Sequence, residues 1–305
     1  MALKAKISVA RDDDPSRANA SKGTAILALA PFVLFLLVFA VYPLAGVVRL
    51  AFSSTRVVDS QFVFDWSGFE NFAAVLNSPV ALASAWTTVI FVITTVAGSV
   101  FLGVAIALIV DRAVFMKSIA RNILVWPAVI TPVVVSVLWL LMLDPTVGGL
   151  NKMLLSLGLP AQGWLNHRAG ALGAIILVDI WHWTPLVYLF MFTALKGIGN
   201  EIVEAARVDG AGEWRIVRSV ILPIMWPSIA VVCILRAIMG IKAFDEMYLL
   251  TRGGPDYATN LLSLHIRTMF FDELNYGYAA AASLLIVAFV TAGVGLSALT
   301  RVKST

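Results

Sequence analysis

The fold of this chain is decided by one short stretch, Glu204-Ala205-Ala206-Arg207-Val208-Asp209-Gly210. It is a polar helix signal that ends at a glycine, between two hydrophobic segments long enough to cross a bilayer. The second of these segments begins at Leu222-Pro223. A membrane protein that keeps a polar helix on a loop is expected to present it to a soluble partner. The stretch therefore indicates a transport subunit driven by another protein rather than an enzyme that acts alone.

Local signals around this stretch define the bounds of the expected helix. Asn200 is placed to cap it, and Glu201 and Glu204 in its first turn match the positive end of the helix dipole. The two alanines after Glu204 have small side chains, so that a partner can approach this side of the helix closely. Gly210 then stops the helix. A second short helix is expected over 213–220, directly before the next membrane span.

The composition of the chain is that of a membrane protein. It has 305 residues, of which 60% are hydrophobic and 13% charged, and its mean hydropathy is +0.91. Soluble domains carry about 25% charged residues, and here the apolar residues form long blocks. The single cysteine, Cys233, lies in an apolar run, where we expect a small buried hydrophobe rather than a disulfide or a thiolate metal site.

Six apolar blocks are long enough to cross the hydrocarbon core, which takes roughly 20 residues. We therefore predict an all-α polytopic membrane protein with six transmembrane helices. Prolines inside several blocks are tolerated in membrane bundles, where they kink the helix. Gly98 and Gly103 give the second block a small-residue face for close helix packing. The blocks cover about residues 25–50, 84–110, 120–143, 169–195, 224–250 and 278–299.

The basic residues lie at the ends of the apolar blocks, which accounts for the sequence pI of about 9.3 without a nucleic-acid partner. With the N-terminus inside, fourteen of the 22 lysines and arginines fall in inner segments and six in outer ones. This bias predicts that both termini and the loop carrying Glu204 are cytoplasmic. Residues 1–22 are expected to be a poorly ordered cytoplasmic tail, and 23–305 the transmembrane domain, with cytoplasmic helices near 200–220.

The predicted outer loops are rich in aromatic residues and turns. Aromatic side chains are normal at a membrane surface, but they would equally suit a docking surface for an external protein. Both interpretations stay open. The residues are Phe62, Phe64, Trp66, Phe69 and Phe72 in the first loop, Trp164 in the second and Gly253-Gly254-Pro255 in the third.

The spacing around the opening stretch resembles the EAA loop of ATP-binding-cassette (ABC) importer permeases. Glu204-Ala205-Ala206 is followed by Gly210, Val220 and Leu222-Pro223 at the spacing of that motif, with Val220 where the family usually has isoleucine. Further segments resemble the carbohydrate-uptake branch, with its permeases for maltose, other oligosaccharides, polyols and glycerol phosphate. They are Asn71-Phe72, Trp126-Pro127, Asp179-Ile180-Trp181, Phe244-Asp245, Gly253-Gly254-Pro255 and Tyr276-Gly277-Tyr278-Ala279-Ala280.

This resemblance implies a type I ABC importer permease fold in a bacterial cytoplasmic (inner) membrane, surrounded by lipid. The EAA helix would be a coupling helix on one of two cytoplasmic ATPase subunits, which bind ATP and Mg. An extracytoplasmic binding protein would deliver a carbohydrate to this chain and a second, different permease. The chain has no Gly-x-x-x-x-Gly-Lys-Ser/Thr loop, so we expect no cofactor on it. The implied coupling residues are Glu204, Ala205, Ala206, Asp209, Gly210, Leu222 and Pro223.

Ionisable groups at membrane depth are functional-site hypotheses by default. The fourth block carries two such groups, Asp179 and His182, and together with Trp183 and Leu186 they stand at positions i, i+3, i+4 and i+7, which lie on one helical face. In the maltose importer, residues at these offsets before the EAA glutamate, and others on the following span, hold the sugar. The resemblance thus implies stacking of a sugar on Trp183, hydroxyl contacts from Asp179 and His182, and room for the ligand beside Gly240. The implied substrate-binding set is Asp179, His182, Trp183, Leu186, Arg236 and Gly240.

A structural interpretation of the same charges stays open, because Asp179 and Arg236 could neutralise one another between two helices. Lys242, Asp245 and Glu246 are expected in the outer part of the fifth span, where they would line the outer mouth or form a gate with the partner permease.

Two other function classes fit the sequence less well. A partner-independent transporter normally has more spans and paired broken helices. An intramembrane enzyme would need a nucleophile and a base, and only Asp179 and His182 could serve, with no serine or cysteine placed to join them. His167 and His265 are isolated outside the spans, so no zinc site is expected.

Overall fold

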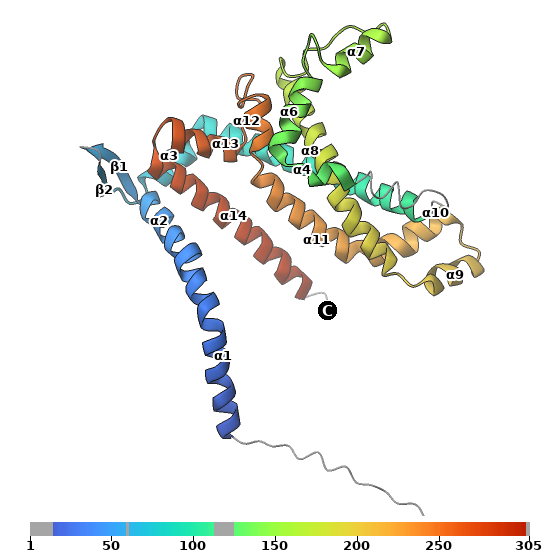
Figure 1. Cartoon of the computed structure of the whole chain (residues 1–305), viewed down its shortest axis with the longest axis horizontal. Coiled ribbons are helices and arrows are strands. Elements are labelled where there is room, and N and C mark those ends of the chain that lie inside the picture. The colour runs from blue at the N-terminus through green and yellow to red at the C-terminus, as the bar shows by residue number, and fades with distance from the viewer. Residues whose placement is uncertain (1–14, 59–60, 113–124, 303–305) are drawn as a thin grey trace, which may run out of the picture.

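The computed structural model describes residues 15–58, 61–112 and 125–302 and is almost entirely helical (Figure 1). The long helices are α1 (Pro15–Leu36), α4 (Pro79–Arg112), α8 (Arg168–Lys196), α11 (Leu222–Ile241) and α14 (Tyr276–Val302). The shorter helices are α2 (Tyr42–Ala51), α3 (Glu70–Asn77), α6 (Pro132–Met142), α7 (Gly149–Ser156), α9 (Asn200–Val208), α10 (Glu213–Ile216), α12 (Asp245–Leu250) and α13 (Leu262–Arg267). Three π-helical turns cover Leu37–Val41, Val217–Ile221 and Thr268–Asp272.

Five helical runs in the described part of the chain are long and apolar enough to cross a membrane. The third predicted block, 120–143, lies partly outside the described residues. Its described part is a helical piece at 125–129 followed by the shorter helix α6. The break falls at Thr131, whose backbone is extended because the residue before a proline disfavours the helical region. The five runs are Ile26–Ala51, Pro79–Arg112, Arg168–Lys196, Glu213–Ile241 and Tyr276–Gly293.

Helix α1 begins at Pro15, inside the segment 1–22 for which the sequence predicts a poorly ordered tail. Proline is favoured at the first helical position, because its fixed φ suits the helix and its missing N–H has no partner there anyway. Helix α1 thus includes 15–22, and residues 1–14 lie outside the described part of the chain.

Two membrane helices widen into a π-helical turn shortly before a proline. Leu37–Val41 precedes Pro43, and Val217–Ile221 precedes Pro223. A proline ring inside a helix clashes with the carbonyl one turn earlier, and a wider turn relieves that clash. As a result, α10, its π turn and α11 form one continuous run, Glu213–Ile241. The predicted boundary between a short helix and a new span at the proline is therefore wrong.

Helix α8 packs along α4, and glycines of α4 lie at the contact. A Cβ atom at Gly98 would lie 2.4 Å from Ile180 Cδ1, and one at Gly103 would lie 2.6 Å from Val187 Cγ1. These distances leave no room for a methyl group, so only glycine permits this approach of the two backbones. The predicted small-residue face is confirmed.

A two-stranded hairpin follows α2 and is a departure from the all-α prediction. Strand β1 (Ser53–Val58) pairs antiparallel with β2 (Gln61–Trp66). Aromatic residues alternate with others along β2, which is a strand pattern, although we interpreted them only as an aromatic loop. At the base of the hairpin, the ring of Phe52 stacks on Trp66 and meets the edge of Phe69, with centroid distances of 5.6 and 5.3 Å.

The fifth predicted block also differs, because α11 ends at Ile241 and a separate helix, α12, begins at Asp245. Asp245 and Glu246 occupy the first turn of α12, where acidic side chains match the positive end of the helix dipole. Helix α12 packs against α6 and α8. Glu246 is consequently only 3% exposed, which corrects its predicted position at an open outer mouth, whereas Lys242 is exposed.

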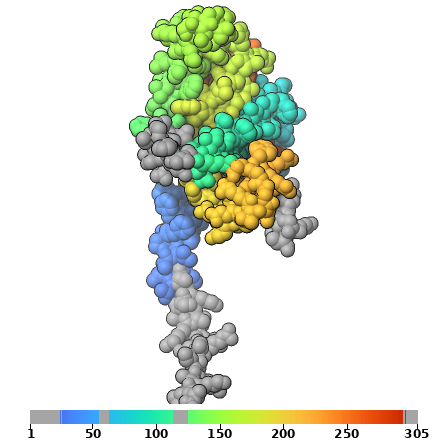
Figure 2. Space-filling view, turned by 90° about the vertical axis from the view of Figure 1, so that its right-hand side faces the viewer, coloured from blue at the N-terminus to red at the C-terminus, as the bar shows by residue number. Residues whose placement is uncertain are grey.

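The arrangement of the helices separates two ends of the molecule. Helix α7 projects beyond the ends of α6 and α8, and α9 with α10 lies near the other end of α8 (Figure 1). The space-filling view shows the same separation, with the α7 region at the top and the 205–225 region below (Figure 2). Helix α8 therefore connects two exposed regions through the packed bundle.

Candidate functional site

A buried ion pair joins two membrane helices. The guanidinium of Arg236 on α11 donates a hydrogen bond to the carboxylate of Asp179 on α8, and each residue is only 1% exposed. Arg236 Nε also donates to Ser99 Oγ on α4, at 3.3 Å. Three helices thus meet at one guanidinium, and the charge of each partner is compensated inside the bundle.

His182 continues this cluster one turn further along α8. Its Nε2 atom lies 3.1 Å from the carbonyl oxygen of Ile130, and its Nδ1 atom lies 3.7 Å from Glu246 Oε1. The ring centroids of His182 and Trp183 are 4.6 Å apart. The guanidinium carbon of Arg236 lies 5.7 Å from the centroid of the Trp183 ring. We call Ser99, Asp179, His182, Arg236 and Glu246 the buried cluster.

The buried cluster is nearly, but not completely, satisfied. Arg236 Nη1 and His182 Nδ1 have no hydrogen-bond partner among the described residues. A buried polar atom without a partner costs free energy, so these two atoms are where another arrangement of the helices, or a polar ligand, would gain most. In the present conformation, Asp179 and Arg236 face one another rather than an open space.

Leu186 and Gly240 lie apart from the buried cluster. Leu186 lines an apolar groove of about 700 Å³ between α8 and α11, which continues along both helices to Ala194 and Val232. A Cβ atom at Gly240 would lie 3.2 Å from Val92 Cγ2 on α4. The space beside Gly240 is therefore filled by a neighbouring helix, and this glycine allows α11 to approach α4.

The structure brings together four of the six predicted substrate residues, Asp179, His182, Trp183 and Arg236, and leaves the other two outside. Sequence reasoning missed Ser99 and misplaced Glu246. Ser99 lies on α4 between Gly98 and Gly103, for which the sequence predicts only close packing. Glu246 is a carboxylate in the outer part of the predicted fifth block, but its buried position depends on the break after Ile241.

The EAA stretch forms the helix α9, which ends at Val208, and Gly210 follows it with φ +79°. The N–H of Gly210 donates to Arg207 O and that of Ala211 to Ala206 O, both at 3.0 Å. Only glycine adopts this left-handed conformation without strain, so the predicted stop at Gly210 is confirmed. The predicted cap is wrong, because Gly199 occupies the cap position and no side-chain cap bond forms.

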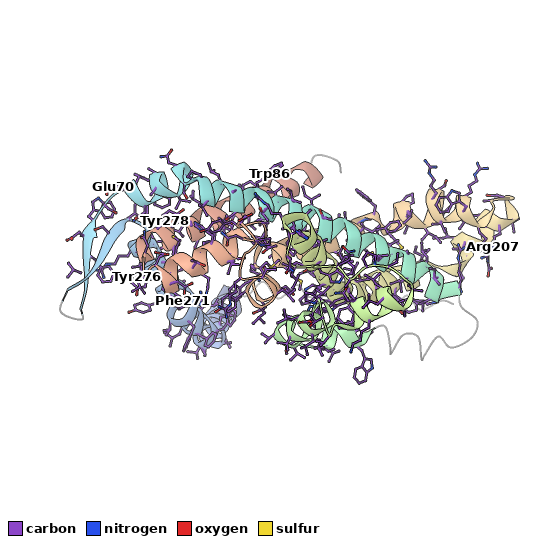
Figure 3. The ribbon with its side chains drawn as sticks, turned by 90° about the horizontal axis from the view of Figure 1, so that it is seen from above. Glu70, Trp86, Arg207, Phe271, Tyr276 and Tyr278 are labelled. Atoms are coloured by element: carbon purple, nitrogen blue, oxygen red, sulfur yellow. The ribbon has the colours of Figure 1, made fainter. Side chains whose placement is uncertain are left out.

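Exposed ion pairs connect this stretch to the end of α4. Glu213 on α10 accepts from Arg207 on α9 and from Arg112 on α4, both at 3.0 Å. Nearby, Lys196 at the end of α8 pairs with Asp111, at 2.5 Å. We call these residues the exposed network. Figure 3 places Arg207 at the opposite end of the molecule from Glu70 and Tyr276.

Three large apolar side chains of α9 and α10, the helices that carry Arg207 and Glu213, are exposed. An exposed apolar patch that is rimmed by charged residues is typical of protein–protein interfaces. With the small side chains of Ala205 and Ala206, this end of the molecule is suited to receive a partner. The three side chains are Ile202, Val208 and Trp214.

An apolar helix bundle with a buried ionic cluster and a polar helix exposed at one end defines a membrane transport subunit rather than an enzyme. Residues 99–301 match the family of binding-protein-dependent transport system inner membrane components, and the chain belongs to this family. It is therefore a multi-pass inner-membrane permease subunit of an ABC importer, in a family that works with a substrate-binding protein and an ATPase.

Similar proteins include two named transport permeases. The chain is 32% identical over 274 residues to the sulfoquinovosyl glycerol transport system permease protein SmoG of Agrobacterium fabrum, covering 89% of each chain. It is 30% identical over 266 residues to the trehalose/maltose transport system permease protein MalF of Thermococcus litoralis, covering 87% of this chain and 88% of the other. Similarity along nearly the whole length places the described helices in the permease fold.

Among solved structures, the fold resembles a chain of a bacterial alginate ABC transporter in complex with an alginate pentasaccharide-bound periplasmic protein. The TM-score is 0.79 at 20% sequence identity, covering 90% of this chain and 93% of that chain. A second structure of a bacterial alginate importer gives a TM-score of 0.78 at 21% identity. The type I permease architecture predicted from the sequence is confirmed.

Proposed function

We propose that this chain forms half of the translocation pathway for a sugar, polyol or sugar derivative. The observation that carries the proposal is α9, a polar helix that ends at Gly210 and stands exposed between two membrane-spanning runs. The similarity to permeases named for sulfoquinovosyl glycerol, trehalose and maltose, and sn-glycerol 3-phosphate supports a carbohydrate-type substrate.

The proposed complex contains a second, different permease, two ATPase subunits that bind ATP and Mg, and an extracytoplasmic binding protein. The basic residues support an orientation with both termini and α9 in the cytoplasm. In that orientation α9 docks on an ATPase through Glu204, Ala205, Ala206 and Asp209, and the run through Leu222 and Pro223 transmits its movement to α11.

Within the pathway, we assign different roles to the predicted substrate residues. Trp183 and Leu186 are partly exposed in this conformation, so they are the side chains available to a sugar. Asp179 and Arg236 hold α8 to α11, and His182 joins them to α12 through Glu246. Gly240 sets the distance between α11 and α4. Substrate contact by the paired charges would require the pair to separate.

The proposed function is tested by co-purification of the chain expressed from its native operon, followed by ATPase assays. A panel of sugars would be added with the binding protein. We expect an ATPase and a second permease to co-purify and one sugar to stimulate hydrolysis. Purification of the chain alone, without ATPase association, would contradict the proposal and favour a partner-independent transporter.

Coupling through α9 is tested by substituting Gly210→Val. A β-branched residue at φ +79° strains the helix end and displaces α9, so we expect ATP hydrolysis to persist while transport falls. The matched control is Gly68→Val, which places similar strain, at φ +58°, in the turn before α3, far from α9. Normal transport by the Gly210 variant would contradict the coupling role.

A further inference from the structure

Two arginines near the start of the run Glu213–Ile241 have no acidic partner in the described part of the chain. They are Arg215 in α10 and Arg218 in the π-helical turn that follows, and both are exposed. The basic residues of the exposed network, at the same end of the molecule, are bonded to carboxylates, whereas these two arginines form no ion pair with any described residue. This end therefore carries positive charge that the described residues do not compensate.

The two arginines lie on the open face of a helix whose other face is buried. Ile216, Val217 and Ile221 belong to the core cluster that α4 and α8 also form. The arginines are three residues apart, which places them on the same side of the helix. Their side chains are thus available to an anion that approaches from outside the bundle.

Two exposed tryptophans lie on either side of Arg218 along this face. Trp214 is 75% exposed and lies four residues before Arg218, whereas Trp226 is 67% exposed and lies eight residues after it. Seven residues make about two turns of an α-helix, and the wider π-helical turn takes up the eighth, so Trp226 returns to the side of Arg218. Tryptophan is enriched at membrane–water interfaces, where its ring lies at the headgroup level.

The sequence of the run locates that level. Before Val220 the exposed side chains are charged, polar or aromatic, and after it they are mainly apolar, beginning with Ile224, which is 45% exposed. Arg218 is roughly 9 Å from Ile224 along the helix axis. A long arginine side chain at this position can cover apolar surface with its stem and hold its guanidinium at the level of the phosphates.

We propose that Arg215 and Arg218, between Trp214 and Trp226, bind the headgroup of an anionic phospholipid of the cytoplasmic leaflet. A guanidinium matches the geometry of phosphate oxygens, and the negative surface of this leaflet attracts basic segments next to a membrane helix. The exposed apolar surface one to two turns deeper is suited to the acyl chains, which favours a lipid over a free phosphate ion. This inference rests on the proposed function, because it needs the proposed orientation of α9.

A lipid bound here affects the run that connects α9 to α11. Helix α10 follows α9 after a short turn and continues into α11 without a break. A bound headgroup holds this run at a fixed depth in the membrane. Movement of α9 then reaches α11 instead of displacing the whole run, so anionic lipid supports the coupling of ATP hydrolysis to transport.

The test uses the assembled importer in nanodiscs made from equal amounts of phosphatidylglycerol and phosphatidylcholine. A photoreactive amino acid replaces Ser219, which is exposed next to Arg218, and mass spectrometry gives the ratio of the two lipids in the cross-linked product. We expect phosphatidylglycerol to predominate. The double variant Arg215→Gln/Arg218→Gln should lower the ratio by at least about fivefold, because one arginine at an anionic surface contributes about that factor.

The matched control is Lys152→Gln/Arg168→Gln, which removes two exposed positive charges at the end of the molecule opposite α9 and should leave the ratio unchanged. Added inorganic phosphate should also leave it unchanged, and a fall would assign the site to a free anion instead. A ratio near one in the unmodified importer, or a cross-link to the ATPase or to the second permease in place of lipid, would overturn the lipid assignment.

Sugar uptake per ATP hydrolysed, measured against the fraction of phosphatidylglycerol, provides the second readout. We expect it to rise with that fraction in the unmodified importer and to change little in the double variant. Equal curves would overturn the role in coupling. Both leaflets of a nanodisc have the same composition, so the cross-linking ratio does not depend on which compartment α9 faces. If no ATPase assembles with the chain, the proposed function fails, and the lipid ratio is still measured on the purified chain.

Discussion

Helix α8 carries ion pairs at two levels, and they differ chiefly in burial. In the middle of the bundle, Asp179 pairs with Arg236, and both are almost completely buried. At the end next to α9, Lys196 pairs with Asp111, and both side chains are partly exposed. Glu213 in the same exposed network is about half exposed. The chemistry of the pairs is the same, but water reaches only one set.

This difference in burial gives the two sets different physical roles. A buried pair has already lost its hydration, so removing one partner leaves an uncompensated charge in a region of low dielectric constant. An exposed pair exchanges its partner for water at little cost. The buried cluster therefore fixes the relative positions of α4, α8 and α11, whereas the ion pairs of the exposed network add little to the stability of the fold.

The largest expected effect is that of Arg236→Met, which leaves Asp179 buried without its partner. Breaking a buried pair costs about 3–5 kcal/mol, so we expect a large fall in the thermal unfolding midpoint in detergent and loss of transport. The control is Arg112→Met in the exposed network, which should leave the midpoint nearly unchanged. If Arg236→Met had the same unfolding midpoint as the unmodified protein, the proposed difference between the buried cluster and the exposed network would be wrong.

The double variant Asp179→Leu/Arg236→Met sharpens the same experiment. Replacing both charges by apolar side chains removes the unpaired carboxylate, so the midpoint should recover much of the loss. Recovery of transport as well would show that the pair only holds the helices together. Recovery of stability without transport would show that one of the two charges contacts the substrate.

The sequence predicts that Asp179 and Arg236 could pair between two helices, because a charged residue in an apolar block must find a partner. It predicts the close packing of α4 because glycines in a membrane helix have few other uses. It does not predict Glu246 as a neighbour of His182. Hydropathy is continuous through 224–250, and only the break after Ile241 turns Glu246 back towards α8.

Similar reasons explain the other differences. A hairpin of aromatic residues and an aromatic loop have the same composition, so the strand pairing of Ser53–Val58 and Gln61–Trp66 was missed. The continuous helix through Pro223 depends on the π-helical turn before it, and no sequence signal used for helix ends identifies such a turn. The side chain of Asn151 bonds the backbone of Gln162 across a loop, and no local sequence pattern predicts these hydrogen bonds.

A smaller effect is expected for Glu246→Gln within the buried cluster. Glutamine keeps the volume of the side chain and can donate a hydrogen bond to His182 Nδ1, which has no hydrogen-bond partner among the described residues in the present conformation, but it removes one buried charge. We expect a change in stability of about 1 kcal/mol, well below that of Arg236→Met, together with reduced transport because α12 is held less firmly to α8. The thermal midpoint and sugar uptake into proteoliposomes measure the two effects. A loss as large as that of Arg236→Met would make Glu246, rather than Asp179, the main partner of the cluster.

The same substitution at Glu213 should have the smallest effect on stability, although Glu213 accepts from two arginines. Because all three side chains reach water, we expect Glu213→Gln to leave the thermal midpoint unchanged within error. Its effect should appear in the salt dependence of transport. Salt screens exposed pairs and hardly affects buried ones, so transport by the unmodified importer should depend on ionic strength more steeply than transport by the variant. Equal salt dependence would mean that the exposed network does not hold α10 to α4, and a large fall in the midpoint would place Glu213 with the buried cluster.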